Sequence, residues 1–288
     1  MKQVYGVIAV WMLGVGLAFG QTNEAVFAET MRVPKGRTVG ETAVAVGQRF
    51  LGLPYVNGTL ESPDGVERLT VNFTEFDCST FVETVLALAE TRHTARPDYA
   101  AFRGSLQEIR YRNGKIRGYL SRMHYFSDWL AENLSNGRLV DLTAQLGGVP
   151  FAKPVCYMSC HRDRYALLDN SATFSELTAL EKEINRRPLF FIPKRKVMSL
   201  EGQLQDGDLV GITSTKYGLD VAHEGFVVRR AGRAYLLHAS SEFGRVMLSK
   251  VPLSDYLRRN PSHSGIIVAR PSTPVNPKTH TLTTLNTN

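Results

Sequence analysis

The sequence of 288 residues predicts an α+β fold, with helices in its first part and an antiparallel sheet in its last part. In the first part, apolar residues recur at the three- and four-residue spacing of amphipathic helices. From residue 205 onward, short segments of branched and aromatic residues are separated by turn residues, which is typical of strands. The sequence shows neither an internal repeat nor a phosphate-binding glycine loop.

The helical part is expected to contain several helices and one short strand. The strand is predicted over residues 67–73, directly before a helix that begins at Cys78, and residues 138–171 are rich in turns. The other predicted helices are Val39 to Leu51, Pro97 to Ile109, Ser121 to Leu134 and Phe174 to Ile184.

The segment from Phe76 to Glu83 places a cysteine at the first position of an amphipathic helix. Asp77 is a good N-cap, and Phe76 with Phe81 is expected to form a hydrophobic staple around it. Cys78 is in phase with the apolar residues of the helix, so it faces inward. Such a cysteine is either a small buried hydrophobic residue or a nucleophile. The free N–H groups and the dipole of the first turn would lower the pKa of the thiol, which favours the nucleophile.

The last part of the chain is predicted to form a sheet that contains a hairpin with two histidines. A short helix is expected over Pro252 to Arg259. The predicted strands are Leu209 to Thr213, Val221 to Arg229, Ala234 to Ser240 and Gly265 to Ala269.

A two-residue turn at Ala231 and Gly232 would set the register of this hairpin. Gly225 then lies opposite His238, and His223 lies two residues along its strand on the same face. The two imidazoles become diagonal neighbours, close enough to interact directly or through one water. The hairpin therefore offers a pair of histidines on one face of the sheet.

Position along the strand also separates the histidines from nearby acids. Asp220 and Glu224 differ from His223 by an odd number of residues, so both should point to the opposite face. Together, Cys78, His223 and His238 have the parts of a nucleophile, a general base and an orienting group. The alternative is a pair of surface or core histidines with no catalytic role.

Both ends of the chain differ from the part between them. Residues 1–20 carry Lys2 and then an apolar run, which predicts a signal peptide, and residues 273–288 are expected to be a disordered tail. Residues 21–272 are then expected to form a single domain, and the chain without residues 1–20 carries a net charge of +6. The protein is expected to be periplasmic or secreted, with no membrane segment after signal removal. The charge suits an anionic partner, but no nucleic-acid recognition motif is present.

The chain has three cysteines, so at least one is unpaired unless a second chain supplies a partner. Cys156 and Cys160 lie four residues apart and could form a strained disulfide, which would leave Cys78 as the free thiol. Cys156, Cys160 and His161 could instead bind a metal, but their spacing fits no common zinc pair and no second ligand pair follows. We therefore expect no metal and no cofactor.

A second line of side chains follows the predicted helix from Ser121 to Leu134. Arg122, Tyr125 and Trp129 recur at spacings of three and four residues. An arginine beside two aromatic rings can stack on sugars and pair with carboxylates, although such a face is also ordinary packing.

These segments resemble the NlpC-type papain-like cysteine peptidases of bacterial cell-wall metabolism. The closer resemblance is to a branch of N-acetylmuramoyl-L-alanine amidase-like proteins, and it covers most of residues 40–270. The resemblance implies a papain-like NlpC-type core, in which the helix-start cysteine packs on an antiparallel sheet, and a largely helical insertion over roughly residues 97–200. The matching segments are 50–55, 58–61, 76–83, 121–126, 207–209, 220–226 and 236–241.

The resemblance implies an exported cysteine amidase that cuts between N-acetylmuramic acid, with preference for its anhydro form, and L-alanine in peptidoglycan fragments. A stem-peptide endopeptidase that cuts after D-glutamate, or a non-catalytic cell-wall binding protein, remains an alternative. Stem-peptide length, oligomeric state and the role of Cys156 and Cys160 stay open. The implied catalytic residues are Cys78, His223, His238 and Tyr55, whose hydroxyl lies beside the reactive sulfur in the family. The candidate substrate-binding residues are Asp77, Ser79, Arg122, Tyr125 and Trp129.

Overall fold

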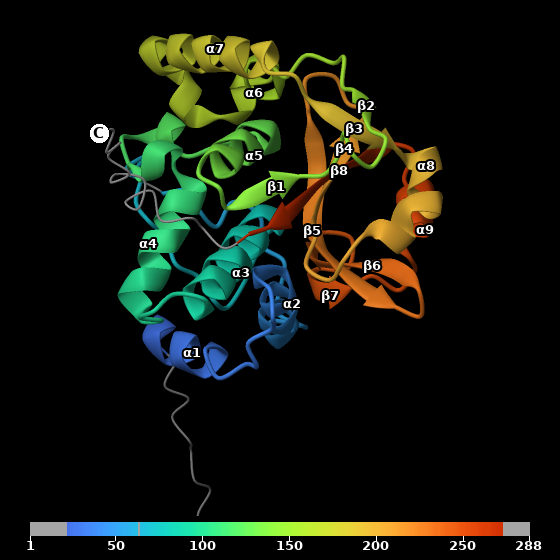
Figure 1. Ribbon diagram of the computed structural model, residues 1–288. Coiled ribbons are helices and arrows are strands. Elements are labelled where there is room, and N and C mark those ends of the chain that lie inside the picture. The colour runs from blue at the N-terminus through green and yellow to red at the C-terminus, as the bar shows by residue number, and fades with distance from the viewer. Residues whose placement is uncertain (1–21, 63, 273–288) are drawn as a thin grey trace, which may run out of the picture.

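The structure is a computed structural model that describes residues 22–62 and 64–272. Figure 1 shows helices on both sides of a central sheet. The α-helices are α1 (Asn23–Thr30), α2 (Val39–Arg49), α3 (Cys78–Arg92), α4 (Tyr99–Arg110), α5 (Phe126–Ser135), α6 (Tyr157–Cys160), α7 (Ser171–Arg186), α8 (Lys194–Leu200) and α9 (Leu253–Arg259). The predicted signal peptide and the predicted tail lie outside the described residues.

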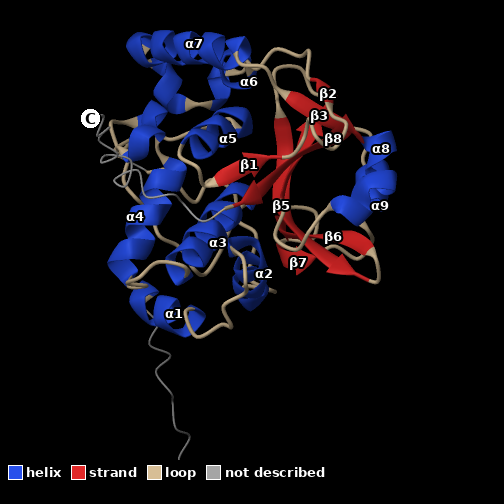
Figure 2. Cartoon of the chain, viewed as in Figure 1, coloured by secondary structure: helices blue, strands red, loops and turns tan. Residues whose placement is uncertain are grey.

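The strands pair into one antiparallel sheet, which confirms the predicted α+β fold (Figure 2). The strands are β1 (Leu139–Asp141), β2 (Val149–Pro150), β3 (Phe190–Pro193), β4 (Leu209–Ser214), β5 (Val221–Arg230), β6 (Arg233–Ser240), β7 (Arg245–Leu248) and β8 (His263–Pro271). Their order in the sheet is β2-β3-β8-β4-β5-β6-β7, and β1 pairs with β8. The hairpin of β5 and β6 therefore lies between β4 and the edge strand β7.

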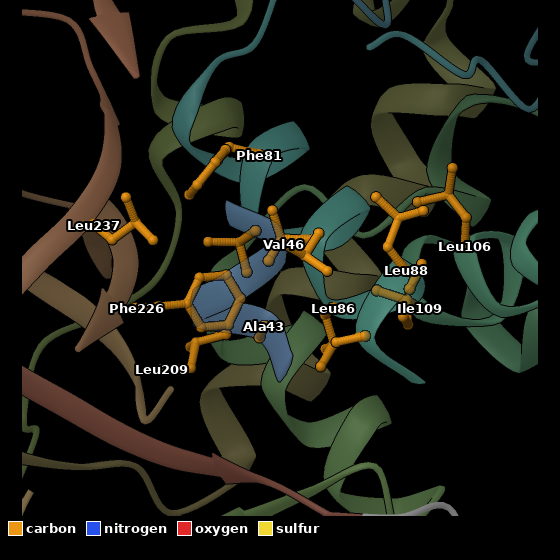
Figure 3. Close-up of a cluster of buried hydrophobic side chains, with 14 of the residues drawn as sticks. Ala43, Val46, Phe81, Leu86, Leu88, Leu106, Ile109, Leu209, Phe226 and Leu237 are labelled. Atoms are coloured by element: carbon orange, nitrogen blue, oxygen red, sulfur yellow. The ribbon is translucent and has the colours of Figure 1, made fainter. Parts of the chain in front are cut away.

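Two hydrophobic clusters cover the two faces of the sheet. On one face, α2 and α3 pack against β5 and β6, as Figure 3 shows for Val46 and Phe81 beside Phe226 and Leu237. On the other face, α8 and α9 pack against residues of the opposite parity, including Val227 and Leu236. Because side chains alternate along a strand, even-numbered residues of β5 such as Glu224 and Phe226 face α3, and odd-numbered ones such as His223 and Val227 face α9.

Most of the predicted helices and strands are confirmed with ends that shift by a few residues. The segment from Glu67 to Phe73 is an exception, because it forms no strand. It is held by side chains instead: Nη1 of Arg110 donates to the Thr70 carbonyl at 2.7 Å, and the Tyr111 hydroxyl donates to the Arg68 carbonyl at 2.9 Å.

The predicted helix from Ser121 to Leu134 is also wrong at its start, because α5 begins only at Phe126. Arg122 is extended and pairs with Tyr111 in an isolated bridge. The side chain of Asp220, from the start of the sheet hairpin, accepts a hydrogen bond from the Ser127 N–H at 2.7 Å. A carboxylate distant in sequence thus satisfies a free N–H of the first turn, which local periodicity could not reveal.

The segment expected to be a helical insertion, residues 97–200, contains α4 to α8 but also β1, β2 and β3. These short strands extend the sheet beyond β8. A third hydrophobic cluster, which includes Tyr125, Met158 and Leu177, joins α5, α6 and α7 (Figure 1). None of the helices in the described part of the chain is long and apolar enough to cross a membrane.

Candidate active site

Cys78 is the first residue of α3, as the sequence predicts. The Asp77 carboxylate accepts a hydrogen bond from the Thr80 N–H at 2.8 Å, and the Thr80 hydroxyl accepts one from the Asp77 N–H at 3.0 Å. The rings of Phe76 and Phe81 meet edge to face with centroids 5.8 Å apart. A capping box and a hydrophobic staple therefore fix the start of the helix and with it the position of the thiol.

The histidine pair is also confirmed. Arg230 pairs with Arg233 across the turn, so β5 and β6 have the predicted register. Nε2 of His223 and Nδ1 of His238 lie 2.5 Å apart in a hydrogen bond, and His238 is only 1% exposed. This bond occupies Nε2 of His223 and leaves Nδ1 as the ring nitrogen available to another group.

Cys78 and His223 line the same cavity, which has a volume of about 260 Å³. They reach it from different faces of β5, because α3 lies on one face and the histidines share the other face with Tyr256 of α9. The thiol and the imidazole therefore meet at a cavity by the start of β5. Aromatic side chains form much of its wall, namely Tyr125, Phe126, Trp129, Tyr157 and Tyr165.

Glu224 is a cavity residue that the sequence analysis did not select. Its odd offset from His223 does place it on the other face, as predicted, and that face is the one against α3. There its carboxyl accepts a hydrogen bond from the Ser79 hydroxyl at 2.6 Å. Burial raises the pKa of Glu224 to about 8, so at neutral pH it is mostly a neutral acid. The strand parity that placed Glu224 opposite the histidines could have identified it.

The thiol of Cys78 does not have the lowered pKa that its helix position predicts. Burial raises its pKa, and the nearby carboxyls of Glu224 and Asp77 add to the effect. Burial also lowers the pKa of His223, and the neighbouring His238 adds to it; burial alone lowers the pKa of His238 to about 4. The resting site therefore holds a thiol and two neutral imidazoles, because desolvation disfavours each charged form.

Tyr55 lies beside the helix start without lining the cavity. It forms an isolated bridge with Phe76, two residues before Cys78. Burial raises the pKa of Tyr55 to about 12, and the charges of Cys78 and Asp77 contribute. Its hydroxyl is therefore a protonated hydrogen-bond donor at neutral pH.

The candidate substrate-binding residues are placed differently from one another. Ser79, Tyr125 and Trp129 line the cavity, but the Tyr125 hydroxyl already donates to Glu181 at 2.7 Å. Arg122 does not line it, and its guanidinium pairs with Glu61 and Glu67 at 2.9 and 3.1 Å. The side chain of Asp77 is used in the helix cap.

Cys156 and Cys160 lie next to each other at the ends of α6. Their sulfur atoms are 2.8 Å apart and both cysteines are free, so the disulfide that the spacing allows is not formed. Nδ1 of His161 forms a hydrogen bond with the Tyr157 carbonyl oxygen at 2.8 Å. No group of three or more metal-ligating side chains occurs within residues 22–62 and 64–272.

The fold and the cavity define a class: α+β proteins in which a helix-start cysteine meets, at one pocket, one histidine of a hydrogen-bonded pair from a hairpin. The sequence matches the model of the N-acetylmuramoyl-L-alanine amidase-like family over residues 45–266. The chain belongs to this family and is an amidase-like enzyme of peptidoglycan. The broader NlpC-type relationship remains a prediction.

Solved structures agree with this assignment. An N-acetylmuramoyl-L-alanine amidase from Bacteroides uniformis is 38% identical, covers 81% of this chain and 99% of its own, and superposes with a TM-score of 0.76. A Bacteroides fragilis protein whose name proposes a xylanase is also 38% identical, over 78% and 98% of the two chains, with a TM-score of 0.73. A Legionella pneumophila protein is 25% identical over 88% and 96%, with a TM-score of 0.66. A search of curated proteins finds no match.

Proposed function

We propose that the protein is an exported cysteine amidase that hydrolyses the amide between N-acetylmuramic acid, in its anhydro form, and L-alanine in peptidoglycan fragments. The observation that carries the proposal is the cavity shared by Cys78 and His223, behind which His238 holds the imidazole. The aromatic wall of this cavity suits the faces of a sugar ring. The family and the Bacteroides uniformis relative support the choice of bond.

The raised pKa of the thiol determines how the first step proceeds. Because a resting thiolate is disfavoured, Nδ1 of His223 takes the thiol proton as the sulfur attacks the carbonyl carbon. No hydrogen bond joins Cys78 to His223 in the described part of the chain, and such contacts often tighten only in the substrate complex. His238 accepts from Nε2 of His223 and so keeps the proton-accepting nitrogen directed at the thiol.

The negative charge that develops on the carbonyl oxygen requires donors. The Cys78 N–H belongs to the first turn of α3, where no intrahelical acceptor exists, and the protonated Tyr55 hydroxyl lies nearby. Collapse of the tetrahedral intermediate breaks the carbon–nitrogen bond, and His223 returns its proton to the departing alanine nitrogen. Water, activated by His223, then cleaves the thioester and frees the lactyl carboxylate and the thiol.

Digestion of purified anhydro-muropeptides followed by mass spectrometry tests the proposal. We expect release of the intact peptide that begins with L-alanine. A dipeptide left on the sugar would support an endopeptidase instead. Binding without turnover would support a cell-wall binding protein. Release of sugar from xylan would support a xylanase, the activity named for the Bacteroides fragilis protein. Cys78→Ser should lower kcat by at least about a thousandfold, whereas Cys160→Ser, the same change at an exposed cysteine outside the cavity, should not.

A further inference from the structure

A second cavity adjoins the first at Ala222 and His223 and is lined by both members of the histidine pair. It has a volume of about 490 Å³. Its remaining walls come from the loop between β4 and β5, the turn between β6 and β7, α9 and the start of β8. The proposed reaction uses the first cavity alone and leaves this larger one without a role.

Two buried histidines present ring nitrogens without partners in this second cavity. His238 and His263 are 1% and 6% exposed, and both line it. Nε2 of His238 and Nδ1 of His263 form no hydrogen bond among the described residues. The ring of Tyr256 separates them, with centroids 5.5 Å from His238 and 5.8 Å from His263. Buried polar atoms are normally satisfied, so two such atoms facing one cavity indicate a ligand.

The tautomer of the histidine pair shows what kind of ligand suits His238. If Nδ1 of His223 is to accept the thiol proton, its Nε2 must carry hydrogen and donate to Nδ1 of His238. His238 must then carry its own proton on Nε2, the atom that lacks a partner. This nitrogen is therefore a donor, and its ligand should be a hydrogen-bond acceptor.

The charges around the second cavity give the sign of that acceptor. Lys216, Lys250 and Arg259 line it, and Glu242 is its single acidic side chain. None of the three cations forms an ion pair within the part of the chain that the structure describes. A positive cavity with buried N–H donors favours an anion.

The first cavity has the opposite character. Carboxyl groups of Glu83, Asp220 and Glu224 line it, together with aromatic rings, and no lysine or arginine does. A neutral sugar fits this wall better than an acidic peptide. The first cavity thus suits the sugar part of the substrate, and the second suits its acidic peptide part. His223 lines both cavities.

We propose that the second cavity binds a carboxylate of the acidic peptide that leaves the enzyme, while the sugar occupies the first cavity. This inference rests on the proposed function, because it assigns the two halves of that substrate to two sides of one site. A peptide carboxylate accepts a hydrogen bond from Nε2–H of His238, and the cations that line the cavity attract it. The carboxylate at His238 also fixes the tautomer that makes His223 a base.

Binding of the released peptide tests the inference without catalysis. The probe is a synthetic acidic peptide that begins with L-alanine and D-glutamate, compared by calorimetry with the same peptide amidated at its carboxylates. Lys216→Ala with Arg259→Ala should weaken binding of the free acid by at least about tenfold, because two charge-assisted contacts are lost. The amidated peptide should bind wild type and variant equally weakly. Equal affinity of wild type for the two peptides, or no loss in the variant, would overturn the inference.

A matched control removes the same charge elsewhere. Lys182→Ala with Arg258→Ala changes one lysine and one arginine that line neither cavity, and should leave peptide affinity within about twofold. With intact anhydro-muropeptide, Lys216→Ala with Arg259→Ala should raise KM and leave kcat nearly unchanged. If wild type binds the free acid through these residues but cleaves nothing, the proposed function fails and the cavity assignment stands. If it cleaves free and amidated substrates with equal KM, the cavity assignment fails alone.

Discussion

The close approach of β5 and β6 at Gly225 should control the geometry of the histidine pair. A Cβ atom at Gly225 would lie 2.6 Å from the Leu237 carbonyl oxygen and 2.9 Å from Cβ of His238, whereas ordinary contacts begin at 3.4 Å. Gly225→Ala must therefore displace the His238 strand by about 0.8 Å to restore an ordinary contact. The 2.5 Å bond between His223 and His238 cannot survive such a movement unchanged.

The size of the effect follows from this displacement. Overpacking of a buried position costs about 1–3 kcal/mol, which corresponds to a fall in Tm of about 2–12 °C for a domain of this size. A misplacement near 1 Å in a catalytic group can cost about a hundredfold in rate. We expect Gly225→Ala to remain folded at 25 °C and to lose about ten- to a hundredfold in kcat/KM for anhydro-muropeptides.

Gly148 provides a matched control. A Cβ there would lie 2.6 Å from the Thr143 carbonyl oxygen, the same clash with a backbone oxygen, but at a position that lines neither cavity. Gly148→Ala should lower Tm by a similar amount and leave kcat/KM unchanged. Calorimetry and steady-state kinetics on both variants decide the matter. Equal losses of stability with intact kcat/KM in Gly225→Ala would refute the argument that this glycine sets the histidine geometry.

Four further predictions concern pH and stability. Because burial lowers the pKa of His223, and that of His238 to about 4, kcat/KM should hold its plateau down to about pH 5; an acid limb at the ordinary value near 6.5 would contradict this. The same shifts make folding stability fall as pH drops from about 6.5 toward 4, because only the unfolded chain binds those protons readily, and urea titrations across that range would detect it. Arg110→Met should cost about 3–5 kcal/mol, since it leaves Glu83 buried without the partner that now lies 2.6 Å away; adding Glu83→Gln should recover most of the loss, and a double variant as unstable as the single would argue against the pairing. Asp77→Ala should cost about 1 kcal/mol through loss of the capping box, measured by thermal unfolding, and an unchanged Tm would show that the cap does not hold the helix start.

The sequence by itself determined the features that depend on neighbouring residues. The N-cap at Asp77 places Cys78 at a helix start, and the two-residue turn after Arg230 fixes the register that brings His223 and His238 together. These signals are reliable because a cap, a tight turn and strand alternation are satisfied within a few residues.

Only the tertiary structure decided what surrounds those groups. Asp220 accepts a hydrogen bond from the Ser127 N–H near the start of α5, which lies later than predicted. Glu61 and Glu67 pair with Arg122, for which periodicity allowed either a substrate contact or ordinary packing. The pKa of the Cys78 thiol also follows burial rather than helix position. Each outcome depends on partners distant in sequence and on exclusion of water, and local patterns carry no information about either. The second cavity, which both histidines line, is visible for the same reason only in the folded chain.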